Sequence, residues 1–430
     1  MKHRAATAGW LSVICAGLGQ LYNRQYVKGL SFILVYAAGI YAIAAKLTPH
    51  LKGIVTLGEQ GQHLVKVGKI YKNVPGDHSI FMMIYGVLAI LVVLLFLLFY
   101  VLNIRDAVVV GRRKQSGSEL RVLNSSVFPW LLLSVPMIGV LFFTIMPIVF
   151  TSLIAFTNYA SPNHIPPKNL VDWVGFATFD KLFNMNVWSD TFVGVLSWTI
   201  VWAILATVTC YFGGILVALL INQQGIRFKG IWRMLFIIPY AIPQFVSLLI
   251  MKNLLNEKFG PINQYFRYFG MEGLPWLNDP FWAKVSVIVV NMWIGIPVSM
   301  ILVMGILTTI PKDLYEAADV DGATAGAKFR NITMPYILFA TAPILITQFV
   351  GNINNFNVIF LLTGGNPATM KYNNAGETDL LVTWLYKLTL DFNQYNIAAA
   401  VSILIFLFIA AAAIVMFRRT RSFNEEDMIQ

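Results

Sequence analysis

The sequence is poor in charged residues and rich in apolar ones. Only 12% of its 430 residues are charged and 57% are hydrophobic, whereas soluble domains carry about 25% charged residues. So small a charged fraction cannot cover the surface of a soluble protein of this size. Several apolar runs approach or exceed the roughly 20 residues that cross the hydrocarbon core of a bilayer. The composition therefore predicts an all-α, polytopic membrane protein.

Other absences argue against whole classes of function. The two cysteines, Cys15 and Cys210, lie in apolar stretches, which disfavours a disulfide framework and a thiolate metal site. The five histidines lack ligand spacing along a helix, and no paired carboxylates face each other within a predicted span. We therefore expect no metal site and no catalytic residues. Lys and Arg are scattered over loops instead of forming one basic face, so we expect no nucleic-acid partner.

Long apolar stretches mark eight candidate membrane spans. They lie near residues 30–47, 81–103, 127–157, 192–221, 233–251, 282–307, 336–362 and 397–417. With a cytoplasmic N-terminus, 18 of the 31 Lys and Arg fall on the inner side, as the positive-inside rule requires. We therefore expect a multi-pass protein of the cell membrane with both termini in the cytoplasm. The apolar stretch 8–22 is short for a span, and we expect it to be re-entrant or interfacial at the cytoplasmic face.

A polar, Gly-rich stretch separates the sixth and seventh predicted spans on the cytoplasmic side. It reads EAADVDGATAGAKFRNITMP, residues 316–335. Asp313 and Glu316 favour the positive end of a helix, and Gly322 can end that helix. A second short helix is predicted from 324 to 331, with a stop before the proline that closes the stretch. The alternative is an ordinary solvated loop, but the small residues favour close contact with a partner.

This stretch resembles the EAA loop of ABC importer permeases. The shared pattern is Glu-Ala-Ala, three residues, Gly-Ala, and then Ile-x-x-Pro. Stretches such as IIPYAIPQFVSLLI (237–250) and NINNFNVIFLLTGGNP (352–367) look like the MalF-type subunit of oligosaccharide importers. The resemblance implies a type I ABC importer permease fold. It also implies that a short helix docks on a cytoplasmic ATPase through Glu316, Ala317, Ala318, Asp321, Gly322 and Ala323.

The same resemblance implies how the chain is divided and what it assembles with. Residues 1–126 would form an N-terminal extension with two spans, 127–417 a six-helix permease core with the coupling loop at 308–335, and 418–430 a cytoplasmic tail. The chain has no G-x-x-x-x-G-K-[ST] phosphate loop, so ATP and Mg²⁺ are expected in a separate ATPase and not in this chain. The implied partners are a second, MalG-like permease, two copies of the ATPase, an extracellular sugar-binding protein and membrane lipid.

Amides and aromatic rings within the predicted spans form the candidate substrate site. Amides hydrogen-bond sugar hydroxyls in both senses, and rings stack on the apolar face of a sugar. An i, i+3 spacing places Asn352 and Asn355 on one face of a helix. With the positions that match the MalF-type motif, the candidate substrate residues are Tyr240, Gln244, Asn291, Trp293, Gly295, Asn352 and Asn355. The alternative role of each amide is a hydrogen bond between helices.

We expect an oligosaccharide as the substrate, with maltodextrin first and galacto-oligosaccharide next. Gly351 stands where MalF-type subunits carry an aromatic residue beside the first Asn, which leaves the exact glycan open. The rival hypothesis is a secondary sugar transporter driven by an ion gradient. That class needs intramembrane carboxylates or a broken-helix ion site, and no acidic residue lies deep in a predicted span.

Overall fold

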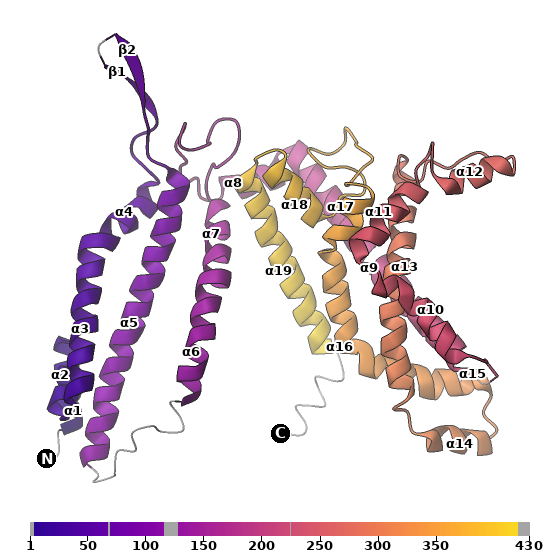
Figure 1. The fold of residues 1–430 in the computed structure, drawn as a ribbon, viewed down its shortest axis with the longest axis horizontal. Coiled ribbons are helices and arrows are strands. Elements are labelled where there is room, and N and C mark those ends of the chain that lie inside the picture. The colour runs from indigo at the N-terminus through magenta and orange to yellow at the C-terminus, as the bar shows by residue number, and fades with distance from the viewer. Residues whose placement is uncertain (1–3, 68, 116–127, 224, 420–430) are drawn as a thin grey trace. The chain divides into compact units, whose positions relative to one another are not determined.

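The structure is a computed structural model that describes residues 4–67, 69–115, 128–223 and 225–419. The chain forms two compact units, Met1–Thr178 and Phe179–Gln430. Their elements are labelled in Figure 1, and each unit is described by itself. The first unit is longer than the predicted N-terminal extension, because it includes the third predicted span.

Helices make up most of the first unit. They are α1 (Arg4–Ile14), α2 (Leu18–Tyr22), α3 (Tyr26–Ala42), the π turn η1 (Ile43–Leu47), α4 (Thr48–Thr56), α5 (Ser79–Gln115), α6 (Phe128–Val140), the π turn η2 (Leu141–Ile145) and α7 (Met146–Ile154). Three of its helical segments are long and apolar enough to cross a membrane: Tyr26–Thr56, Ser79–Lys114 and Leu132–Ile154. These correspond to the first three predicted spans.

The apolar stretch 8–22 forms most of α1 and α2, and both helices are too short to cross a bilayer. They pack against the later part of α5 through small residues: a Cβ added at Gly19 would lie 2.8 Å from the Cβ of Ala107. The side chain of Gln20 donates hydrogen bonds to the carbonyl oxygen of Asn103 (3.0 Å) and to Asp106 Oδ2 (3.1 Å). The segment is therefore held on another helix.

A β-hairpin between α4 and α5 departs from the all-α prediction. Strands β1 (His63–Val67) and β2 (Ile70–Val74) pair antiparallel, with His63 opposite Val74 and Val67 opposite Ile70. In Figure 1 the hairpin projects beyond the adjoining ends of α4 and α5. We did not predict it from the sequence, because the hydropathy pattern identifies long membrane spans and not short strands between them.

The second unit holds the remaining helices. They are α8 (Ala177–Asn184), α9 (Asn186–Asn222), α10 (Lys229–Ala241), α11 (Gln244–Leu254), α12 (Pro261–Tyr268), α13 (Pro280–Leu307), α14 (Lys312–Val320), α15 (Ala325–Lys328), the π turn η3 (Phe329–Thr333), α16 (Met334–Ile353), α17 (Phe356–Leu362), α18 (Leu381–Leu390) and α19 (Tyr395–Arg419). Across the described part of the whole chain, seven helices are long and apolar enough to span a membrane, or eight if the bent pair α10–α11 counts as one span. The predicted all-α fold with about eight spans is confirmed.

The core of the second unit lies between α9 and α13, with α16 and α17 packed beside them. Trp202 and Ala206 of α9 are buried in one cluster with Val287 of α13 and Ile359 of α17. Small residues bring the two long helices close: a Cβ added at Gly214 would lie only 2.7 Å from the backbone nitrogen of Met300. Such close approach is typical of helix pairs in membranes, where packing stabilises association instead of the exclusion of water.

Candidate functional site

Two of the predicted spans are interrupted, one between α10 and α11 and the other between α16 and α17. The helices α10 and α11 meet at an angle of 90°. Pro243 has no backbone N–H, and Ile242 before it is extended, with φ −82° and ψ 134°, as a residue that precedes proline prefers. The second break separates α16 from α17, where the Asn355 side chain accepts a hydrogen bond from the backbone N–H of Val358 (3.4 Å). Broken helices in membrane transporters expose backbone and polar groups where a substrate can bind.

The two breaks lie together, because α11 packs against α17. A direct bond also joins them: Asn357 Nδ2 donates to Gln244 Oε1 over 3.3 Å. Gln244 belongs to the predicted substrate set, and the structure thus brings it to the second break. Asn357 lies in the same stretch as Asn352 and Asn355 but is not a member of that set.

The predicted amides Asn291, Asn352 and Asn355 make hydrogen bonds between helical segments. Asn355 Nδ2 donates to Asn291 Oδ1 (3.3 Å), and Asn291 Nδ2 donates to the sulfur of Cys210 (3.3 Å). Asn352 Nδ2 donates to Thr207 Oγ1 (2.9 Å). Asn291 and Asn352 are buried while Asn355 is half-buried. The first two therefore hold α9, α13 and α16 together, as the alternative role of these amides required.

The aromatic members of the predicted set are more accessible. Tyr240 on α10 is 61% exposed and Trp293 on α13 is 46% exposed. Gly295 lies against α9 instead, since a Cβ there would be 2.4 Å from the sulfur of Cys210. In this conformation its lack of a side chain serves helix packing. The two rings are thus exposed in this chain, and Asn355 and Gln244 are half-buried.

The coupling loop at 308–335 contains the predicted arrangement of a helix, a turn and a second helix. Helix α14 ends before Asp321, and Gly322 then adopts φ +71°, a conformation that glycine tolerates. The backbone N–H of Ala323 donates to the carbonyl of Ala318 (2.9 Å), which satisfies a group left open at the helix end. In Figure 1, α14 lies across the direction of α13 at its end.

One boundary of this motif was predicted wrongly. The second helix does not stop before Pro335 but continues from α15 through η3 into α16. Pro335 lies just after the π turn η3 inside this continuous helix, and such a local change of winding lets a membrane helix tolerate the missing N–H of proline. The segment is therefore joined to the broken span α16–α17 by a continuous helix, which provides a mechanical connection between them.

The face of α14 that carries the EAA pattern is open to contact. Glu316, Ala317 and Asp321 are exposed, as are Gly322 and the apolar side chain of Val320. Ala318 and Ala323 are half-buried. Lys328 pairs with Asp319 across the turn, and the hydroxyls of Tyr315 and Thr333 are 2.8 Å apart. These contacts brace the turn while they leave Glu316 free to meet a partner.

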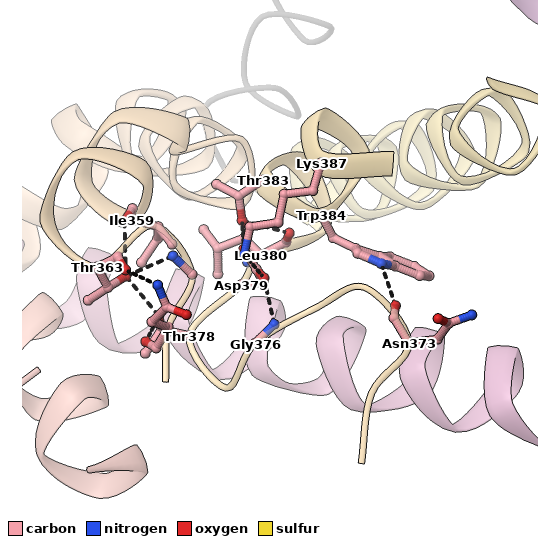
Figure 2. Close-up of polar contacts among 12 residues, drawn as sticks. Ile359, Thr363, Asn373, Gly376, Thr378, Asp379, Leu380, Thr383, Trp384 and Lys387 are labelled. Atoms are coloured by element: carbon pink, nitrogen blue, oxygen red, sulfur yellow. Dashed lines mark hydrogen bonds and ion pairs between the residues drawn. The ribbon is translucent and has the colours of Figure 1, made fainter. Parts of the chain in front are cut away.

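A buried ion pair, absent from the predicted site, braces the loop between α17 and α18. Figure 2 shows the Asp379 carboxylate at its centre: it accepts from Lys387 Nζ (2.6 Å), the Thr383 hydroxyl (2.9 Å) and the backbone N–H of Gly376 (2.7 Å). Burial raises the pKa of Asp379, and the positive charge of Lys387 opposes that shift. The spacing of Asp, Thr and Lys at i, i+4 and i+8 was the available signal in the sequence.

The same loop is tied to α17 and to its own helix α18. In Figure 2 the hydroxyls of Thr363 and Thr378 meet over 2.8 Å, and Trp384 Nε1 donates to the carbonyl of Asn373 (3.1 Å). Gly365 lies directly against the carboxylate of Asp379. The second half of the broken span therefore continues into a loop whose conformation is set by buried contacts.

Comparison with known proteins identifies the family. Residues 210–422 match the family described as "Binding-protein-dependent transport system inner membrane component". The galactooligosaccharides transport system permease protein GanP of Bacillus subtilis is 40% identical over 434 residues, which cover 99% of this chain and all of GanP. The chain belongs to this permease family. The maltodextrin transport system permease protein MdxF of the same species is 37% identical over the full length of both chains.

Two further comparisons place this permease among longer relatives and solved structures. The maltose/maltodextrin permease protein MalF of Vibrio parahaemolyticus is 39% identical over 58% of this chain but only 48% of its own length. A bacterial alginate ABC transporter, solved with an alginate-bound periplasmic protein, superposes on 69% of this permease with a TM-score of 0.57 and 23% identity. The expected ABC importer permease fold is thus confirmed. A permease of this family is not itself an enzyme, and these comparisons give no support to an ion-gradient-driven transporter.

Proposed function

We propose that this permease imports an oligosaccharide, with maltodextrin or galacto-oligosaccharide as the substrate class. The relatives that match over nearly their full length transport these two kinds of sugar. The observation that carries the proposal is the contact between the two interrupted spans, where Asn357 bonds Gln244 and Asn355 bonds Asn291. Tyr240 and Trp293 would stack on the sugar rings, and Gln244 and Asn355 would hydrogen-bond the hydroxyls. Asn291, bonded to Asn355, would orient that amide.

Space beside the amides favours a long substrate. A Cβ added at Gly351 would meet nothing within 4 Å. An aromatic ring there would narrow the path next to Asn352, and its absence supports a chain of several sugar units. The choice between the two glycans rests on uptake measurements and not on this geometry.

We further propose that the chain is one half of a permease pair that works with a separate ATPase. A MalG-like permease would complete the path, two ATPase copies would bind ATP and Mg²⁺, and an extracellular binding protein would deliver the sugar. Glu316 on the exposed face of α14 would meet the ATPase. The continuous helix from α15 to α16 would transmit a movement of α14 to the break between α16 and α17, because a rigid helix moves as one body. Both termini would lie in the cytoplasm, as the distribution of Lys and Arg favours.

Reconstitution of the whole importer tests this function. We expect the assembled complex in liposomes to take up labelled maltodextrin or galacto-oligosaccharide only with ATP and the binding protein. Glu316→Lys should abolish coupling while the permease pair still assembles. Asp313→Lys is the matched control, because it makes the same charge change on an exposed residue of α14 outside the EAA pattern. Uptake by this chain alone, without an ATPase, would contradict the proposal.

A further inference from the structure

The β1–β2 hairpin presents an uncovered apolar surface. Leu64 is 66% exposed, Val67 60%, Ile70 74% and Tyr71 64%. Every residue of both strands is exposed except Val74, which is half-buried. An isolated two-stranded hairpin is marginally stable in water and needs packing against another element. The exposure of the strands therefore indicates a surface that is completed by a partner.

The base of the hairpin, in contrast, is fixed to the helices. The carboxylate of Asp77 accepts hydrogen bonds from the backbone N–H groups of Glu59 (2.8 Å) and Gln60 (3.1 Å). The backbone N–H of Asp77 donates back to the carbonyl of Gln60 over 2.7 Å. A Cβ added at Gly76 would lie 2.4 Å from the backbone of the facing segment, so the two sides of the base are in contact. The hairpin is thus held in place on α4 and α5 before any partner binds, and such preorganisation lowers the entropic cost of association.

The charge of the hairpin restricts the partner. Lys66, Lys69 and Lys72 lie on it, and residues 60–76 contain no acidic residue. A second copy of the hairpin would bring like charges together, which disfavours self-pairing along the open strand edges. Figure 1 shows the strands beyond the ends of α4 and α5, where a spanning helix leaves the hydrocarbon core. Because the strands project away from the helix ends, their lysines lie away from the bilayer surface, and an acidic protein that approaches these ends is the occupant we infer.

The strand register places a lysine and apolar side chains on the same face of the hairpin, so one partner can contact both. Lys66 lies opposite Tyr71, and Val65 lies opposite Lys72. Residues that face each other across an antiparallel pair project on the same side of the sheet. Each side of the hairpin therefore combines a lysine with apolar contact area, the mixture that gives an interface both orientation and affinity.

We propose that this hairpin is a docking element for the extracellular sugar-binding protein and that it contacts an acidic face of that protein. The inference rests on the proposed function and on the cytoplasmic N-terminus, which together put the loop between α4 and α5 outside the cell. The family works with a binding protein by its description, and the hairpin assigns part of that contact to the first unit of this chain.

The test measures binding of the purified cognate binding protein to the complete importer in nanodiscs of neutral phosphatidylcholine. We expect the triple variant Lys66→Glu, Lys69→Glu, Lys72→Glu to slow association by about tenfold at low salt. The difference should shrink in about 1 M salt, where the Debye length is about 3 Å. Tyr71→Ser should mainly speed dissociation, because buried aromatic contacts act on the lifetime of a complex.

A matched control separates the hairpin from the total charge. The triple variant Lys168→Glu, Lys181→Glu, Lys258→Glu makes the same charge change at exposed lysines of other loops predicted to face outward. It should leave association within about twofold of wild type. Equal slowing by both triple variants would overturn the proposal, as would an effect that occurs only in nanodiscs of anionic phosphatidylglycerol, which would assign the hairpin to lipid.

A shortened variant keeps the test independent of any single side chain. Replacement of residues 64–73 by Asn-Gly retains the fixed base and removes the strands. If wild type shows sugar-stimulated ATP hydrolysis and the shortened importer binds the binding protein equally well, the docking role is wrong and the proposed function stands. If wild type shows no stimulation and no binding, both fail.

Discussion

The buried ion pair between Asp379 and Lys387 offers a sharp test of the packing in the second unit. The Asp379 side chain is 0% exposed and that of Lys387 is 17% exposed. Lys387→Met removes the positive charge and leaves a carboxylate in the protein interior. Breaking one side of a buried pair costs about 3–5 kcal/mol of unfolding free energy. Because the Thr383 hydroxyl and the Gly376 N–H still donate to the carboxylate, we expect a loss near the lower end, about 3 kcal/mol.

The loss should depend on pH in a defined direction. Burial raises the pKa of Asp379 in the folded protein, and removal of Lys387 takes away a charge that lowers it. Between its unfolded and folded pKa values the folded chain then binds more protons than the unfolded chain, so stability falls as the pH rises. The difference between variant and wild type should therefore be largest at alkaline pH and smaller in acid, where the carboxyl group is neutral.

The assay is unfolding by SDS in mixed micelles, followed by tryptophan fluorescence. Trp384 lies in the same loop region, with its ring 6.4 Å from that of Trp188. Lys371→Met is the matched control, since Lys371 is an exposed lysine of the same loop, and it should change stability by less than about 0.5 kcal/mol. The double variant Asp379→Asn, Lys387→Met should recover much of the loss, because no unpaired charge remains. The reasoning is refuted if Lys387→Met is as stable as Lys371→Met at pH 8.

Three further predictions concern single positions. Gly365→Ala should lower the unfolding free energy by more than about 2 kcal/mol, because φ is +82° and the new Cβ would lie 1.9 Å from Asp379 Oδ1. Gly364→Ala is the control: φ is +62° there, but the contact with Asp379 is absent. It should lower the unfolding free energy less in the same SDS titration. Gly351→Phe should preserve assembly but raise KM for long oligosaccharides more than for short ones, measured by uptake in liposomes; equal KM values would count against the proposed path. Backbone N–H groups lower the pKa of Asp77, so the hairpin base should be stable above the usual Asp value of about 4 and loosen as the pH falls through the lowered pKa. Hydrogen exchange of residues 59–76 would detect this, and Asp77→Asn should remove the pH dependence.

Much of the fold could be predicted because a membrane acts on each segment separately. A span must satisfy its own backbone groups and present apolar side chains to lipid. A long apolar run such as the one in α9 can therefore be recognised as a membrane span from its own residues alone. The turn of the coupling loop was also predictable from local sequence, because Gly322 supplies a positive φ directly after α14. The second boundary of this loop was missed because a helix inside a membrane protein can continue through a proline such as Pro335 when a π turn precedes it.

The candidate site was only partly predictable. The sequence identified the amide-rich stretch, but spacing alone did not reveal that the helix breaks before Asn355 or that Asn357 bonds Gln244. Nor could it decide which amides face a ligand. The burial of Asn291 depends on how α13 packs against α9, and that depends on small residues far away in the chain.

The sequence by itself determined the class of protein and the membrane spans, since each follows from the composition of continuous segments. Only the tertiary structure decided the partners of the polar groups. Asn355 meets Asn291 and Lys387 neutralises Asp379 because helices and loops fold onto one another. The β-hairpin likewise became visible only when its strands were paired and its apolar side chains were found uncovered. Contacts of this kind depend on the relative placement of segments, which local composition does not contain.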